Sequence, residues 1–196
     1  MNRDWNTLAR RISDVLSPPV LAVPTLLVGV WTSETAEAFR FAALYFLMAV
    51  VIPASYLVWL LRSGRITDVH LPNRRDRRAP FLVFLLCSLA GLCVLIWLGA
   101  PTPLVASVAA LVVQAAVLLL ITLAWQISIH TASIGGLATF ATLAIGGTAA
   151  ALFLLVGLVA WARLYLQRHT LAQAVAGACV GSVSFLVLFA LQGVVW

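Results

Sequence analysis

The amino-acid sequence predicts an all-α membrane helix bundle with about six to seven transmembrane helices and an N-terminal interfacial helix. Of its 196 residues, 63% are hydrophobic and 9% are charged, whereas a soluble domain is about half apolar and about a quarter charged. The mean hydropathy is +1.09, and apolar runs approach the roughly 20 residues that a spanning helix needs. A water-soluble protein of this size could not cover so much apolar surface. At this length we expect a single integral-membrane domain over residues 1–196.

The first element is expected to be a short helix within residues 1–16 that lies in the membrane interface. Trp5, Leu8, Ile12 and Val15 fall on one helical stripe, and the arginines of this segment lie elsewhere on the helix. Such an amphipathic pattern is typical of helices that lie along a bilayer surface.

The helix bundle is expected to occupy residues 17–196. Ser17 followed by two prolines resembles a helix cap and first turn, and Pro24 predicts a kink in the segment that follows. The apolar runs predict membrane segments at about 17–31, 38–61, 80–99, 102–125, 128–146, 148–162 and 171–195.

The charges are distributed unequally between the two sides of this bundle. If the segments alternate sides, one side collects all the arginines except Arg40, while the other carries Arg40, Glu34 and Glu37. The positive-inside rule then places the arginine-rich side in the cytoplasm, and we expect the inner membrane of a bacterial cell. The net charge of +6 fits membrane topology and anionic headgroups better than nucleic acid.

Three polar clusters lie on this arginine-rich side. The first is GRITDVHLPNRRDRRAP (64–80), which is either a solvated loop that anchors helix ends or an anion-binding rim of guanidinium groups. The second is ISIHTASIGG (127–136), in which His130 is either a satisfied interfacial histidine or a proton donor. The third is WARLYLQRHTLAQ (161–173). Because each pair of neighbouring clusters is separated by two expected helices, all three can form one composite site.

The third cluster has internal helical spacing. His169 and Gln173 are four residues apart on one helix face, so the amide can orient the imidazole ring. Arg163 and Arg168 are either part of a site or a pair that extends to the membrane interface. Small residues follow both histidines: Ala132 and Gly136 in one segment, Gly177 and Gly181 in the other. Such faces let helices approach closely, which would bring His130 and His169 together.

These spacings resemble the integral-membrane type-2 phosphatidic acid phosphatases, relatives of the vanadium haloperoxidases. The third motif of that family is Ser-Arg-x5-His-x3-Asp, and Ala162-Arg163, His169 and Gln173 reproduce its spacing, with Gln173 where the family has Asp. Residues 127–130 (ISIH) fall where the family has Pro-Ser-Gly-His. The 62–80 loop stands at the place of the first motif, Lys-x6-Arg-Pro. The resemblance covers about residues 62–181.

The resemblance implies a mechanism without a metal or other cofactor. His169 would attack phosphorus and form a phosphohistidine, oriented by Gln173, and His130 would protonate the leaving alcohol. Residues expected to bind the phosphoryl oxygens are Arg163, Arg74, Arg75, Arg77, Arg78 and Ser128. The function expected is that of a membrane lipid-phosphate or isoprenoid-(di)phosphate phosphatase.

The expected partners are membrane lipids, lipid phosphates or prenyl phosphates, without nucleic acid and with possible membrane-complex partners. The alternative is a catalytically inactive relative that serves as a lipid- or pigment-binding subunit of a larger membrane complex. A prenyltransferase is a weaker third hypothesis, because it would need paired aspartate-rich motifs and only Asp68 and Asp76 lie in the right region.

Overall fold

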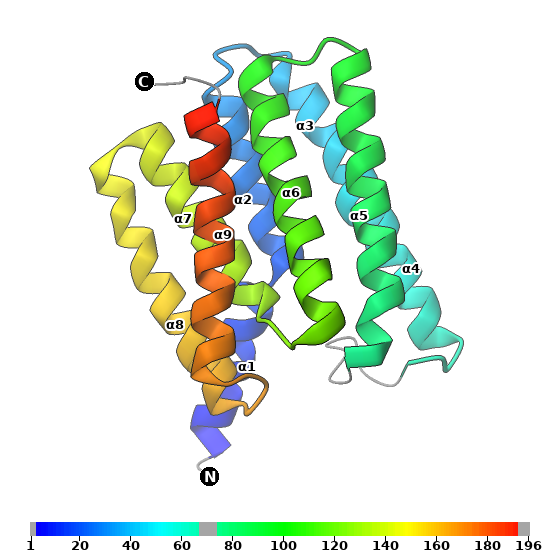
Figure 1. Cartoon of the computed structure of the whole chain (residues 1–196), viewed down its shortest axis with the longest axis vertical. Helices are drawn as coiled ribbons and strands as arrows, with labels where there is room; N and C mark the ends of the chain where they lie inside the picture. The colour runs from blue at the N-terminus through cyan, green and yellow to red at the C-terminus, as the bar shows by residue number, and fades with distance from the viewer. Residues whose placement is uncertain (1–2, 67–73, 192–196) are drawn as a thin grey trace. The chain divides into compact units, whose positions relative to one another are not determined.

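A computed structural model describes residues 3–66 and 74–191 and contains no strand within these ranges, in agreement with the expected all-α class. Its elements, in order, are α1 (Arg3–Val15), α2 (Pro18–Trp31), α3 (Ala38–Phe46), the π-helical turn η1 (Leu47–Val51), α4 (Ile52–Arg62), α5 (Arg74–Trp97), α6 (Thr102–Ala124), α7 (Ile129–Ile145), the 3₁₀ segment η2 (Gly147–Leu152), α8 (Phe153–Tyr165) and α9 (Leu171–Leu191) (Figure 1). The contacts divide the chain into two compact units. Unit 1 comprises Met1–Val28 and Gln126–Trp196, and unit 2 comprises Gly29–Trp125.

Fewer helices than expected are long enough to cross a membrane. In the described ranges, four continuous helical stretches qualify by length and composition: Ala38–Arg62, Arg78–Trp97, Thr102–Ala124 and Gly147–Tyr165. The pair α1–α2, bent by 44°, could form a fifth. The expected six to seven spans are therefore replaced by four or five.

Helix α7 shows why the number of spans is lower. It starts after Ser128, whose side chain caps the helix, and ends at Gly146, whose φ of 100° leaves the helical region. The intervening 17 residues rise only about 25 Å, against a hydrocarbon core of about 30 Å.

In unit 2, a proline explains the irregular middle of the first long span. Pro53 has no N–H, and its ring would clash with the carbonyl four residues earlier in a regular helix. The chain widens into the η1 turn immediately upstream, where the N–H of Ile52 bonds to the carbonyl of Leu47. Close to this turn, α3 packs on α5 because the ring of Tyr45 lies against Gly91, where a Cβ would come within 2.8 Å of the ring.

In unit 1, helices α7 and α9 pack together through small residues, as their spacing predicted. A Cβ on Gly135 would lie 2.8 Å from the carbonyl oxygen of Ala178. A Cβ on Gly181 would overlap the carbonyl oxygen of Ala132 on α7. Glycine at these positions therefore lets the two backbones touch. Further along the same pair, the rings of Phe140 and Phe185 stack with centroids 5.1 Å apart.

Helix α1 buries its small residues against protein and leaves its large apolar residues exposed. Ala9 and Ser13 are buried, and α1 packs on α8, where the Trp5 ring meets Trp161 edge-on at 6.0 Å. The apolar stripe that the sequence indicated remains open, since Leu8 is 43% exposed and Val15 64% exposed. This arrangement suits a helix whose small residues pack on protein and whose large apolar residues face lipid.

Candidate functional site

The second and third polar clusters lie together in unit 1. Three hydrogen bonds join the chain before and within α7 to the start of α9: Ser128 N–H to the Gln173 carbonyl (3.2 Å), the Thr131 hydroxyl to the Ala174 carbonyl (2.8 Å), and the Gln126 side-chain amide to the Arg168 carbonyl (3.5 Å). Two of these donors are buried. The start of α7, which carries His130, and the turn before α9, which carries His169, are therefore held against each other.

The start of α9 is a reciprocal capping box. Thr170 precedes the first helical residue, and its hydroxyl oxygen accepts the backbone N–H of Gln173 at 3.3 Å. In return, Oε1 of Gln173 accepts the backbone N–H of Thr170 at 3.1 Å. This pair satisfies two N–H groups that a helix start would otherwise leave without partners. Gln173 thus has a structural reason to be an amide or acid with a side-chain acceptor.

The capping box also assigns the ring nitrogen of His169 that carries the hydrogen in the neutral imidazole. Because Oε1 of Gln173 faces the N–H of Thr170, the amide orientation follows from the network. Nδ1 of His169 lies 3.2 Å from this same oxygen, so Nδ1 must carry the hydrogen that the contact needs. In the neutral ring, Nε2 then bears the lone pair. His169 as a whole is 8% exposed, and its ring contacts a side chain that also caps the start of α9.

The second cluster is organised around the start of α7. Ser128 is fully buried, and its side chain accepts the backbone N–H of Thr131 at 3.4 Å. This serine therefore caps α7, which accounts for it without a bound phosphate. His130 is the second residue of the helix and is half-buried. It lies at the positive end of the helix dipole, where negative charge is favoured.

Arg163 is buried at the last turn of α8. It is 3% exposed, and its Nη1 donates to the Ser13 hydroxyl of α1 at 2.8 Å. The carbonyl of Arg163 accepts the N–H of Arg168 in the turn that leads to His169. Arg163 thus connects the N-terminal helix to the segment that carries the candidate nucleophile.

We expect a Ser13→Ala variant to lose about 1.5–3 kcal/mol of stability, the usual worth of a hydrogen bond to a charged group. Thermal unfolding of the detergent-solubilised protein, followed by size-exclusion chromatography, would measure the loss. Ser33→Ala is the matched control. The Ser33 hydroxyl donates at 2.7 Å to the backbone carbonyl of Gly29, four residues earlier, and so makes a local bond to an uncharged group. Equal stability of the two variants would contradict a structural role for the Ser13–Arg163 bond.

The first polar cluster belongs to unit 2, and much of it lies outside the described residues. This applies to residues 67–73, including Asp68, and to the side chains of Arg74, Arg75 and Arg77. Arg78 is exposed near the start of α5. The expected contribution of these arginines to phosphate binding stays a prediction.

Sequence reasoning overlooked two residues that support the site. Thr170 could have been found, because Thr-x-x-Gln before an apolar run is the capping-box pattern. Ser13 had no such signal, since it is 150 positions from Arg163 in the chain. Only packing of α1 on α8 brings the two side chains together.

Within the described ranges, no three His, Cys, Asp or Glu side chains gather as metal ligands would. Comparisons with protein-family models, curated proteins and solved structures find no match for this chain.

Proposed function

We propose that unit 1 is a membrane phosphatase that transfers the phosphoryl group of a lipid phosphate or isoprenoid (di)phosphate to His169. One observation carries the proposal: a buried imidazole whose Nδ1 lies 3.2 Å from the Gln173 oxygen. A nucleophilic histidine needs a lone pair on one nitrogen and a fixed partner on the other. The Gln173 contact supports the second condition, because it gives Nδ1 a fixed partner, and it favours the tautomer with the lone pair on Nε2.

The reaction proceeds in two balanced steps. The Nε2 lone pair attacks phosphorus, the bond from phosphorus to the lipid oxygen breaks, and His130 gives a proton to the departing oxygen to yield the alcohol. His130 then accepts a proton from water as the resulting hydroxide attacks phosphorus, which breaks the P–N bond, releases phosphate and restores His169. Arg163 would stabilise charge on the phosphoryl oxygens.

The membrane setting supports a lipid substrate. The long apolar helices fit a membrane protein, and α1 exposes an apolar stripe beside a buried arginine contact. A substrate with its tail in the bilayer would present its phosphate at the surface where such a helix lies. We propose the cytoplasmic face of a bacterial inner membrane for this surface, from the distribution of arginines.

A rival proposal is an inactive relative that binds a lipid or a pigment within a larger membrane complex. It is favoured by Gln173 itself, because an amide at this position carries no charge to stabilise an imidazolium. In the Ser-His-Asp triad, replacing the orienting carboxylate by an amide slows catalysis about 10⁴-fold, a loss that includes a change of imidazole tautomer as well as the missing charge. The two proposals differ in whether any phosphate is released.

Phosphate release by the purified chain would test the proposal, with phosphatidic acid and with short and long prenyl phosphates as substrates. His169→Ala should fall to background, and labelling with radioactive substrate should give an acid-labile phosphoenzyme only when His169 is present. His130→Ala should slow release from lipid phosphates about 10²–10⁴-fold. With an aryl phosphate whose leaving group needs no proton, the His130→Ala effect should nearly vanish. A folded wild type that releases nothing from any substrate would support the inactive relative.

A further inference from the structure

The outer face of α4 in unit 2 carries a hollow that the proposed phosphatase site does not use. Its volume is about 500 Å³, within the range of roughly 300–1,000 Å³ that ligand pockets occupy. Val51, Ala54 and Val58 line it, and it continues past Trp59 to Arg62. The hollow lies over Ala54 and Ser55, whose small side chains leave room above the helix.

The hollow begins at the η1 turn and follows the helix to its end. From Val51 to Arg62 the backbone rises about 16 Å, which is about half of the roughly 30 Å hydrocarbon core of a bilayer. Its length therefore matches the acyl chain of one leaflet. Val58 and Trp59 are 43% and 48% exposed, so this wall is open to lipid.

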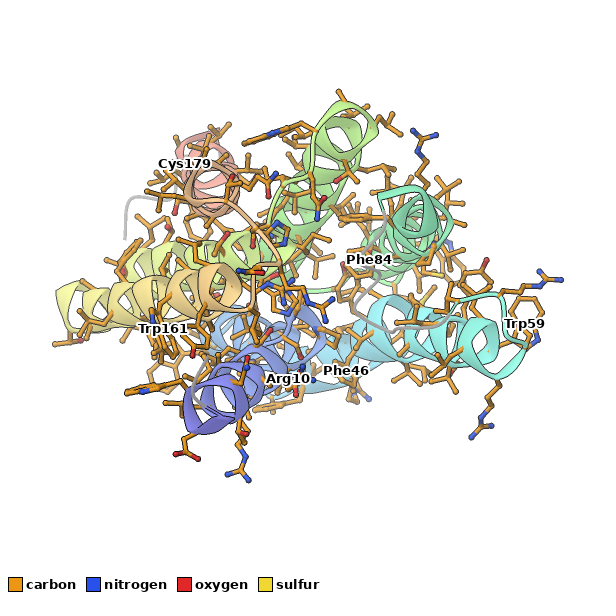
Figure 2. The ribbon with its side chains drawn as sticks, turned by 90° about the horizontal axis from the view of Figure 1, so that it is seen from below. Arg10, Phe46, Trp59, Phe84, Trp161 and Cys179 are labelled. Carbon is orange, nitrogen blue, oxygen red and sulfur yellow. The ribbon has the colours of Figure 1, made fainter. Side chains whose placement is uncertain are left out.

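The end of the hollow is cationic and aromatic. Arg62 is the last residue of α4, and the guanidinium of Arg65 lies 4.7 Å from the centre of the Trp59 ring. Tyr56 stacks on Trp59 with centroids 5.8 Å apart. Figure 2 shows Trp59 at the outer edge of this helix. Aromatic rings of this kind gather at the headgroup level of a membrane.

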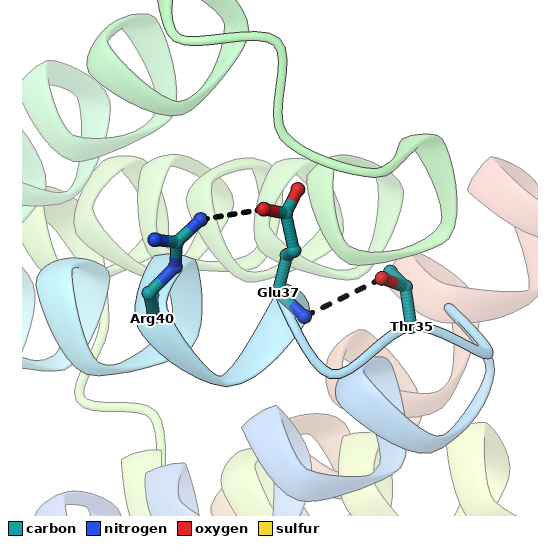
Figure 3. Close-up of polar contacts among 3 residues, drawn as sticks. All are labelled: Thr35, Glu37 and Arg40. Atoms are coloured by element: carbon teal, nitrogen blue, oxygen red, sulfur yellow. Dashed lines mark hydrogen bonds and ion pairs between the residues drawn. The ribbon is translucent and has the colours of Figure 1, made fainter.

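The α3–α4 span, Ala38–Arg62, has arginines at both ends, and their surroundings differ. At the start of α3, Arg40 pairs with Glu37 at 2.6 Å, and the Glu37 N–H bonds to the Thr35 hydroxyl (Figure 3). At the other end, Arg62 and Arg65 form no ion pair with any acidic side chain that the structure describes, a set that leaves out Asp68 and Asp76. Two guanidinium groups thus lie at the mouth of an apolar hollow that is one leaflet long.

From these features we propose that the α4 hollow binds one anionic phospholipid of the surrounding leaflet. One acyl chain lies along Val51, Ala54 and Val58, and the phosphate headgroup contacts Arg62 and Arg65. The chemistry fits because guanidinium forks match phosphate oxygens and because small residues on the helix leave room for a chain.

Native mass spectrometry of the full chain in mild detergent would test this proposal. The protein is equilibrated with an equimolar mixture of phosphatidylglycerol and phosphatidylcholine that share the same acyl chains. The wild type should retain one phosphatidylglycerol in preference to phosphatidylcholine. The double variant Arg62→Gln/Arg65→Gln should lose this preference by roughly ten- to thirtyfold, at about fivefold for each arginine near a membrane surface.

Two controls test whether lipid binding depends on the hollow itself. One removes a positive charge elsewhere on the span, and the other adds bulk to a different exposed apolar face. Arg40→Gln removes a charge at the opposite end of the same span and should leave the preference unchanged. Ala54→Phe fills the hollow and should reduce retention of both lipids, whereas Leu86→Phe on the exposed face of α5 should not. Equal retention of the two lipids by the wild type would overturn the proposal. The proposal would also be overturned if Arg40→Gln reduced the lipid preference as much as the double variant does, or if Ala54→Phe retained both lipids fully. The Ala54→Phe result tests the proposal even if the double variant fails to fold.

Discussion

A Gly181→Ala variant is expected to lose about 2–3 kcal/mol of stability, although alanine is the better helix former. The added Cβ would overlap the carbonyl oxygen of Ala132 and lie 2.8 Å from the backbone nitrogen of Gly136. Both obstacles are backbone atoms of α7, so no side-chain rotation can relieve them. Overpacking of this kind costs about 1–3 kcal/mol or more, and the helices would have to separate to accommodate the methyl group.

The matched control is Gly157→Ala on α8, where a Cβ would meet nothing within 4 Å. This change should stabilise the helix by up to about 1 kcal/mol. Fluorescence-detected size exclusion after stepwise heating in detergent would measure both variants. The two glycines should therefore shift the midpoint of unfolding in opposite directions. Indistinguishable midpoints would show that α7 and α9 are not packed through Gly181.

The α7–α9 contact was predictable because its determinant is local in sequence. Small residues four apart on two segments define two flat faces, and flat faces approach closely whatever the rest of the fold does. The all-α class was predictable for a similar reason, since an apolar chain of this composition must satisfy its backbone hydrogen bonds within helices.

The number of spans was not predictable from hydropathy, because helix ends are set by caps and backbone conformation. The apolar run at 128–146 is long enough on composition alone. The Ser128 cap and the φ of 100° at Gly146 limit its helix to 17 residues. The π-helical turn before Pro53 is a comparable case. A proline signals an irregularity, but the form that the chain adopts depends on what packs beside it.

Part of the candidate site was likewise predictable from the sequence, and part was not. The histidine and glutamine four residues apart were recognisable, and the structure places them in contact at 3.2 Å. The expected shared helix face was wrong, because His169 lies in the turn before α9 and Gln173 lies in its first turn. The second task of Gln173, capping α9, changes how its identity is interpreted. A residue that seemed a neutral substitute for an acid is also the partner of Thr170. The contact between Arg163 and Ser13 depends on tertiary packing alone.

A Gln173→Glu variant should raise phosphatase activity by at least tenfold, with an upper bound of about 10⁴-fold set by carboxylate-to-amide exchange in a comparable triad. Glutamate is the other residue that completes a capping box at this position, and a negative charge in the first helical turn is favourable. The variant should therefore keep the start of α9 intact. It would add a carboxylate beside Nδ1 of His169, where positive charge develops as Nε2 bonds to phosphorus.

Two further variants separate the catalytic role of Gln173 from its structural role. Gln173→Met removes the acceptor with little change in volume, so it should lose both activity and about 1 kcal/mol of helix stability. Thr170→Ala breaks the capping box from the other side and leaves the Gln173 amide beside His169. It should cost a similar amount of stability but little of the turnover measured on folded protein. If Gln173→Glu is no faster and Gln173→Met no slower than wild type, the amide does not act through His169, and its presence is explained by the helix cap alone.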